Sequence, residues 1–412
     1  MGLGLIVRRQ REVLRASASF RSLFGSTVIS GLGTWLAVIA LSVDVFDRTR
    51  SGVWVAALLI ADFLPVVLIG LLLGPLVDRL SRKRLLVGAD LVRLAAFVLL
   101  ALAVRPWQIV ALAFVAGVAS GFARPAAYAG LPNLVDAETL PRANSLLRTA
   151  EQLTVTTGTL LGGLLVAAAG PDLAYWLNAG SFLASAALLS RIPGGLLQKG
   201  SVASHGHWRD VVEGVEAVRH SRALLTVLLT WNLVQLGIAL VNVSEVVLAK
   251  VSFNAGDVGF GLMWTASGVG AAVGALFAAT WLERRTMTMV YAAAIGLMAF
   301  GDLTAAVSPN VWVALWCIAL GNIGTATAIV CNSLLVQRGA PDHLRGRAFT
   351  LIMGSNAAVL GVGMAAAGLL VDGVGARWVW AISAAFTALG ALVGYGLLRR
   401  TPERMLEPAA EH

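Results

Sequence analysis

The sequence predicts an all-α integral membrane protein with twelve transmembrane helices arranged as two six-helix bundles. Composition is the first reason: of 412 residues, 58% are hydrophobic and only 13% are charged, whereas a soluble domain carries about 25% charged residues. Long apolar runs are the second reason, because about 20 apolar residues cross a membrane. The third is a repeat that relates the two halves of the chain. Together these observations exclude a soluble globular protein.

Twelve apolar runs of helical length follow one another, separated by polar connections that carry most of the charge. With boundaries uncertain by a few residues, they lie at about 20–43, 53–77, 85–104, 107–131, 145–169, 174–190, 223–247, 258–281, 287–307, 311–336, 349–370 and 377–398.

Basic residues are concentrated in every second connection. The net charge is +9, and 25 of the 31 Lys and Arg residues lie on one side of this alternation. Because cytoplasmic loops of membrane proteins are enriched in Lys and Arg, both termini are predicted to be cytoplasmic. The positive charge thus indicates topology, and no nucleic-acid partner is expected.

The two halves of the chain repeat at a single offset. Arg142 recurs as Arg347 (347 − 142 = 205), and the segment GLLV at 163–166 recurs at 368–371 (368 − 163 = 205). Two parallel six-helix halves are a known transporter plan. The predicted domains are an N-terminal bundle over 1–190, a cytoplasmic linker with an amphipathic helix over 191–222, and a C-terminal bundle with a cytoplasmic tail over 223–412.

A basic turn after the second apolar run carries the most specific local signal. Residues 74–84 read GPLVDRLSRKR, which resembles the loop signature G-x-L-x-D-R-x-G-R-K of the major facilitator superfamily, with Ser81 in place of the second glycine. The resemblance implies the major facilitator fold. In it, Asp78 would face a helix N-terminus, and Arg79 and Arg82 would pair with acids such as Asp136 or Glu138. The gating role implied for this turn falls on Gly74, Asp78, Arg79, Arg82, Lys83 and Arg84.

Further segments resemble exporters of this superfamily. Gly158, Gly162 and Gly163 lie in GTLLGG, which is similar to an exporter stretch G-P-x-x-G-G, with Thr159 in place of proline. FARPA at 122–126 and LPNLV at 131–135 resemble a subgroup of enterobactin exporters and macrolide-efflux-like proteins.

This resemblance implies a monomeric protein of the bacterial cytoplasmic (inner) membrane. It would export a small amphipathic molecule by alternating access, with proton-coupled antiport. An importer or a lipid flippase on the same fold is an alternative, because fold does not fix direction or cargo. A non-transporting membrane sensor or scaffold is the alternative from another class.

Ionisable residues inside apolar runs are candidates for a transport role. Asp62 lies near the middle of the second run, with no cation within a helical turn. Because a buried charged carboxylate is costly, Asp62 is predicted to exchange protons and to couple transport to a proton gradient. The alternative is that Asp62 only lines a water-filled cavity.

Two pairs of opposite charge have the spacing of neighbours on one helix face. Asp90 and Arg93, and Arg148 and Glu151, are each three residues apart, so structural ion pairs are predicted for both. Glu151 could instead line the cytoplasmic entrance. Two other acids, Glu245 and Asp302, lie near the outer ends of their runs, and we expect them to be solvated there.

Polar and aromatic residues within the runs are candidates for a substrate cavity. Asn and Gln side chains also hold helices together, so each is a weak candidate alone. The sequence contains no metal-ligand cluster, phosphate-binding loop or nucleophile–base pair. Neither a metal, a cofactor nor an enzymatic activity is therefore expected, and the expected partners are a small molecule, protons and lipid. The predicted cavity residues are Trp35, Gln152, Thr156, Asn232, Gln235, Asn322 and Asn356.

Overall fold

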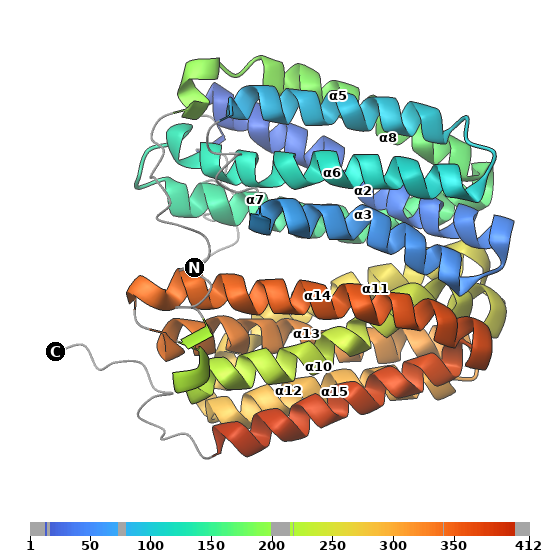
Figure 1. Ribbon diagram of the computed structural model, residues 1–412, viewed down its shortest axis with the longest axis vertical. Helices are drawn as coiled ribbons and strands as arrows, with labels where there is room; N and C mark the ends of the chain where they lie inside the picture. Colours follow the sequence, from blue (N-terminus) through green and yellow to red (C-terminus); the bar gives the residue numbers. More distant parts are fainter. Residues whose placement is uncertain are drawn as a thin grey trace. The chain divides into compact units, whose positions relative to one another are not determined.

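A computed structural model describes residues 13–14, 17–72, 80–198, 215–216, 218–340 and 342–399, and within these ranges the regular structure is helical throughout (Figure 1). Twelve α-helices of this described part have 19 residues or more. They are α2 (Ala18–Thr49), α3 (Gly52–Leu72), α5 (Arg82–Leu100), α6 (Pro106–Gly130), α7 (Leu140–Ala169), α8 (Pro171–Ser190), α10 (Arg222–Val247), α11 (Gly256–Arg284), α12 (Met287–Val307), α13 (Val311–Gly339), α14 (Asp342–Val374) and α15 (Ala376–Leu398). Short 3₁₀ turns η1 (Leu131–Asn133) and η2 (Gly194–Gln198) and a π-helical turn η3 (Leu248–Ser252) lie between them.

Eleven of the described helices are long and apolar enough to cross a membrane. The remaining long helix is α5, which contains Arg82, Lys83, Arg84, Asp90 and Arg93. These charges lower its hydropathy, although two of them neutralise each other, as described below. An all-helical, multi-pass membrane protein is therefore confirmed. Twelve crossings and cytoplasmic termini stay predictions.

The helices form two compact units. The first contains Met1–Arg50 and Leu58–Ala203, and the second contains Ser51–Ala57 and Ser204–His412. The predicted boundaries at 190 and 223 stay predictions. The amphipathic helix predicted in the linker falls mostly on 199–214, outside the described residues.

Helix pairing is the same in both units. In the first, α2 packs against α7 and α8, and α5 packs against α6 and α8. In the second, α10 packs against α14 and α15, and α12 packs against α13 and α15. The offset also relates α5 to α12, which begin at Arg82 and Met287 (287 − 82 = 205). The repeat seen in the sequence therefore extends to the packing of the helices.

A pair of glycine turns follows the same repeat. Gly170 ends α7 with φ 76°, and Gly375 ends α14 with φ 84°. The two positions differ by the same offset (375 − 170 = 205). Positive φ is accessible to glycine without the steric cost that other residues incur. Each unit thus reverses its chain between its last two helices by the same device.

Glycines without room for a side chain lie where α7 crosses α2 in the first unit. A Cβ added at Gly158 would lie 2.8 Å from the Cβ of Trp35, and one at Gly162 would lie 2.9 Å from the carbonyl oxygen of Leu36. Gly163 is also buried. The exporter-like glycine stretch of α7 therefore packs directly on the backbone of α2.

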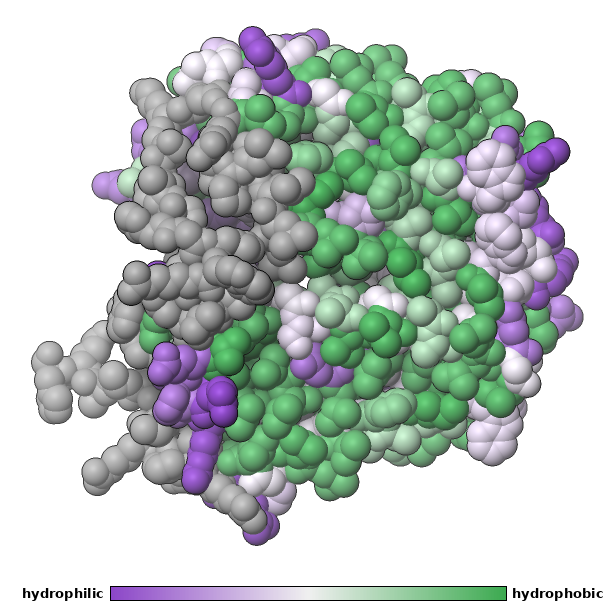
Figure 2. Space-filling model, in the orientation of Figure 1, coloured by the Kyte–Doolittle hydropathy of each residue, from purple (hydrophilic) through white to green (hydrophobic). Residues whose placement is uncertain are grey.

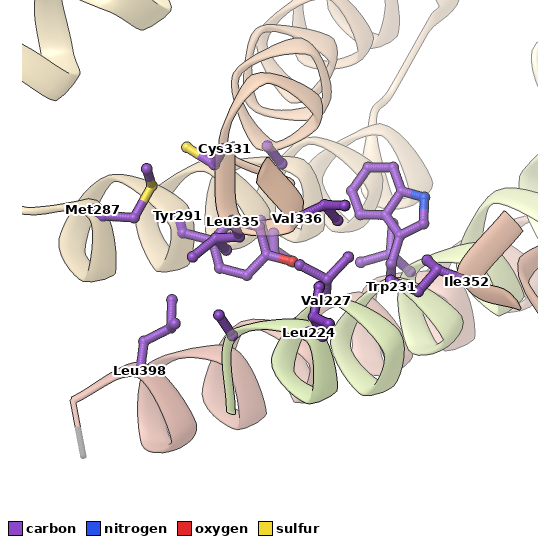
Figure 3. Packing of buried hydrophobic residues seen from close by; sticks show 14 of the residues in the cluster. Leu224, Val227, Trp231, Met287, Tyr291, Cys331, Leu335, Val336, Ile352 and Leu398 are labelled. Atoms are coloured by element: carbon purple, nitrogen blue, oxygen red, sulfur yellow. The ribbon is translucent and has the colours of Figure 1, made fainter. Parts of the chain in front are cut away.

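Cores of large apolar side chains hold each unit together. In the second unit, Trp231, Tyr291, Leu335 and Ile352 come together from α10, α12, α13 and α14 (Figure 3). The Tyr291 hydroxyl donates to Asn332 Oδ1 at 2.7 Å. This hydrogen bond satisfies the one polar group of Tyr291 in an apolar environment.

Many large apolar side chains also lie on the surface. Trp316, Leu276 and Leu369 are 80%, 76% and 70% exposed. On the face seen in Figure 2, hydrophobic residues cover the middle of the helices, and the coloured hydrophilic ones gather towards the helix ends. This distribution is typical of a protein whose solvent is the bilayer core, flanked by two polar interfaces.

Candidate functional site

A cavity of about 600 Å³ lies within the first unit and receives side chains from α2, α3, α5, α6, α7 and α8. Its lining mixes aliphatic and aromatic residues with hydroxyls, amides and charges. Predicted residues on this lining are Trp35, Asp62, Asp90, Arg93, Arg148, Glu151 and Gln152. Such a mixture suits an amphipathic ligand, because apolar groups can be buried while a few polar groups fix orientation.

The Asp90–Arg93 ion pair forms within α5. Its partners are deeply placed: the side chains of Asp90 and Arg93 are 1% and 14% exposed. The Arg93 guanidinium also lies over the ring of Phe182, 4.3 Å from its centroid. A cation over an aromatic ring away from water gains about 2 kcal/mol. Arg93 therefore links α5 to α8 and is held in one position beside the cavity.

Asp62 stands apart from that pair. It lines the cavity from α3 and is partly exposed to it. The charge of Arg93 acts on it electrostatically. Among the residues that the structure describes, neither a hydrogen bond nor an ion pair of the Asp62 carboxylate is present. This carboxylate is thus open to the cavity and can bind a proton or a cationic group there.

Arg148 and Glu151 differ from the prediction, because no ion pair joins them among the described residues. Both instead contact Tyr128, which was not among the predicted site residues. The Tyr128 hydroxyl donates to Glu151 Oε2 at 2.8 Å, and the Arg148 guanidinium lies 5.6 Å from the centroid of the Tyr128 ring. Tyr128 of α6 thus contacts both Arg148 and Glu151 of α7. The three side chains form a polar cluster on the cavity wall.

One wall of the cavity is a stripe of small polar residues on α2. Thr27, Ser30 and Thr34 line it, and each donates to the carbonyl four residues earlier, at 2.7 to 2.9 Å. Their spacing of three or four residues was a readable signal of one helix face. Thr156, by contrast, is not on the lining and bonds to the Gln152 carbonyl of its own helix.

Of the predicted amides of the second unit, Asn356 is buried, and Asn232, Gln235 and Asn322 are partly exposed. Asn232 donates from Nδ2 to Ser355 Oγ at 2.8 Å, joining α10 to α14. Asn322 donates to the carbonyl of Ile318 in its own helix. Asn356 is 3% exposed, and its amide has no hydrogen-bond partner among the described residues. Gln235 is partly buried.

The basic turn is described only from Leu80 onwards, so Gly74, Asp78 and Arg79 lie outside the described residues. Arg82 is buried and donates to the carbonyl oxygens of Ala129 and Leu197, at 3.0 and 2.9 Å. These carbonyls take the place of the acidic partners that were predicted for Arg82.

Ser81 caps α5 by accepting from the Arg84 N–H at 3.5 Å. A hydroxyl group is preferred at the N-cap of a helix. Ser81, which replaces the second glycine of the signature, therefore stabilises the start of α5.

Glu245 also differs from expectation. We expected solvation at the outer end of its helix, but Glu245 is only 4% exposed. The nearby Asp302 is partly exposed and accepts a hydrogen bond from Ser383 Oγ at 2.9 Å. Asp302 also acts electrostatically on Glu245. Packing of α10, α12 and α15 therefore removes from water a carboxyl group that lies near a helix end in the sequence.

Comparison with known proteins decides the family. The family model described as transmembrane secretion effector, of the major facilitator type, matches residues 14–411. The chain belongs to the transmembrane secretion effector family. Its members are transporters of the major facilitator superfamily, so the resemblance read from residues 74–84 is confirmed.

Curated relatives of this chain include efflux proteins. The multidrug efflux pump Tap of Mycolicibacterium fortuitum is 28% identical, over 85% of this chain and 88% of its own. Macrolide efflux protein A of Streptococcus pyogenes is 21% identical, over 86% and 90%. An MFS-type transporter of Bacillus subtilis, YfiS, is 26% identical over 93% of each chain. The similarity to macrolide efflux proteins predicted from FARPA and LPNLV is confirmed.

Solved structures support the fold alone. A bacterial homologue of the iron transporter ferroportin has a TM-score of 0.75 at 17% identity, over 93% of this chain and 99% of its own. The nucleoside transporter NupG has a TM-score of 0.74 at 13% identity, over 93% and 100%. At 13–17% identity, this likeness shows that the chain shares their architecture.

Proposed function

We propose that this secondary transporter exports a small amphipathic molecule by alternating access and that proton entry drives the export. The observation that carries the proposal is the cavity of the first unit, where the Asp62 carboxylate is open to the lining. The efflux relatives Tap and macrolide efflux protein A support the outward direction.

Proton coupling would depend on a difference between two carboxylates: Asp90 is paired with a cation, and Asp62 is not. The Asp90 carboxylate is already paired with Arg93, so its charge is compensated inside the helix bundle. Asp62 is influenced by the same cation but, among the described residues, makes no ion pair with it. A deprotonated Asp62 is attracted to Arg93, whereas a protonated Asp62 is neutral and cheaper to place in a low-dielectric region. Gain and loss of one proton would therefore change how α3 interacts with α5.

The cargo would be bound by both parts of the lining. Trp35 and Phe63 offer aromatic surface, and Ser30 and Thr34 offer hydroxyls on α2. Glu151, held by Tyr128, is a further carboxylate on the cavity wall, beside Asp62 and the paired Asp90. This combination suits a molecule with an apolar body and a polar or cationic group, the chemistry of many effluxed compounds.

Asp78 remains the proposed gating residue on the strength of the signature alone. Replacing Asp78 by Asn is expected to leave membrane insertion intact and to slow transport strongly, because the interaction with a helix N-terminus would be weakened. Normal efflux by this variant at normal abundance would contradict the gating role.

Transport can be tested in inverted membrane vesicles with ethidium, an amphipathic fluorescent cation, and with a macrolide. We expect accumulation that stops when the proton gradient is collapsed. Asp62→Asn should abolish gradient-driven accumulation, while Asp172→Asn, a matched change at an exposed carboxylate of α8, should not. Uptake into right-side-out cells instead of inverted vesicles would indicate an importer, and accumulation without a gradient would refute proton coupling.

A further inference from the structure

The basic run that opens α5 sends its side chains to different surroundings. Arg82 is buried on the carbonyls of Ala129 and Leu197. Lys83 donates from Nζ to the carbonyl of Ser190 at 2.6 Å. Arg84 is exposed, and within the described ranges its guanidinium makes neither an ion pair nor a side-chain hydrogen bond. Two of the three cations thus tie helix ends together, and the third is left at the surface.

Arg84 stands at one end of an apolar groove of about 450 Å³ between α5 and α6. Gly88 and Val92 continue its row on α5, at i+4 and i+8. Phe114, Val118 and Phe122 form the facing row on α6 with the same spacing. Residues four apart lie on one helix face, so two parallel stripes make the walls. Among the residues that the structure describes, Arg84 is the one charged residue on this lining.

The groove opens outward and has an empty floor. Phe114 and Val92 are 51% and 44% exposed. A Cβ added at Gly88 would meet nothing within 4 Å. Glycine in mid-helix is unfavourable relative to alanine, and here it leaves space that neighbouring side chains do not fill.

The length of the groove matches one leaflet of a bilayer. From Arg84 to Val92 the eight-residue rise along α5 is about 12 Å. Half of the hydrocarbon core of a bilayer is about 15 Å. A chain entering beside Arg84 could therefore run along the groove for most of one leaflet.

We propose that this groove binds one anionic phospholipid, with an acyl chain over Gly88 and the phosphate group at Arg84. An apolar lining with a single cation at its mouth complements a lipid that combines an apolar tail with a negative headgroup. Basic sites between transmembrane helices on the cytoplasmic side favour such lipids, and the predicted topology places Arg84 on that side. The proposal is independent of the cargo and of proton coupling.

Native mass spectrometry of the purified full-length protein can test this. Phosphatidylglycerol and phosphatidylcholine are titrated separately. We expect one phosphatidylglycerol to bind more tightly than phosphatidylcholine. Arg84→Gln should weaken that binding about fivefold, the usual contribution of one cation near an anionic lipid. Gly88→Leu should remove it by filling the groove.

Two control variants match these changes elsewhere in the first unit. Arg191→Gln removes an exposed arginine next to the end of α8, and Gly180→Leu adds the same bulk at an exposed glycine of α8 with open space around it. Both should bind phosphatidylglycerol like the unaltered protein. If Gly88→Leu proves unstable, Arg84→Gln alone still decides the headgroup contact.

Three results would overturn the proposal. The first is equal affinity of the unaltered protein for the two lipids. The second is unchanged binding in both Arg84→Gln and Gly88→Leu. The third is a dimer that Gly88→Leu dissociates, which would assign the groove to a second copy of the chain.

Discussion

Gly117 of α6 lies directly against the backbone of α3. It is buried, and a Cβ added to it would lie 2.4 Å from the backbone carbonyl oxygen of Asp62. Ordinary contact at such a position begins near 3.4 Å. Gly117→Ala therefore forces the two backbones apart by about 1 Å, because a carbonyl oxygen cannot rotate away as a side chain does. Overpacking of this kind costs about 1–3 kcal/mol.

A matched glycine isolates that cost. Gly180→Ala introduces the same methyl group on α8, where nothing lies within 4 Å. In both variants alanine favours the helix by about 0.5–1 kcal/mol, so this contribution cancels in the comparison. The difference in unfolding free energy between Gly117→Ala and Gly180→Ala should therefore be about 1–3 kcal/mol.

Unfolding of the two purified variants in mixed micelles with increasing sodium dodecyl sulfate measures this difference. Efflux in vesicles gives a second readout, because moving α3 also moves Asp62 relative to Arg93. We expect Gly117→Ala to unfold earlier and to transport more slowly than Gly180→Ala. Equal stability of the two variants would refute the close approach of α3 and α6 and the position that it gives to Asp62.

Two ion pairs give further tests. Arg48 donates to both oxygens of the buried Asp44 at 2.6 and 3.0 Å. Arg48→Gln leaves this buried carboxylate without a cation, with, among the described residues, only the Tyr175 hydroxyl donating to it at 3.0 Å, and should cost about 3–5 kcal/mol in the same unfolding assay. The exposed Arg50→Gln should change little, and similar losses in the two variants would contradict the difference in burial. Asp90→Asn should destabilise the protein by a similar amount because Arg93 loses its partner. The double variant Asp90→Asn/Arg93→Gln should recover part of this loss. If the losses of the two single variants simply add in the double variant, the two residues are not coupled.

Much of the fold was predictable from two properties of the sequence, its local hydropathy and its internal repeat. A run of about 20 apolar residues predicts a membrane-crossing helix regardless of which helices pack beside it. Two halves with related sequences are expected to adopt the same arrangement of helices. The offset of 205 was readable in the sequence, and the structure adds the glycine turns at Gly170 and Gly375, which the sequence had not singled out. The Asp90–Arg93 pair was equally accessible, since both partners lie on one helix turn.

What the tertiary structure alone decided depends on how each helix is rotated and which helix lies beside it. Tyr128 lies between Arg148 and Glu151 only because α6 packs beside α7 in the cavity wall. Arg82 bonds to the carbonyl of Leu197, 115 residues away. The burial of Glu245 and the open groove at Gly88 likewise follow from side chains supplied by other helices. Most of these helices are apolar on nearly every face, so the periodicity of the sequence contains little information about which face is inward. The contacts between helices decide which face that is.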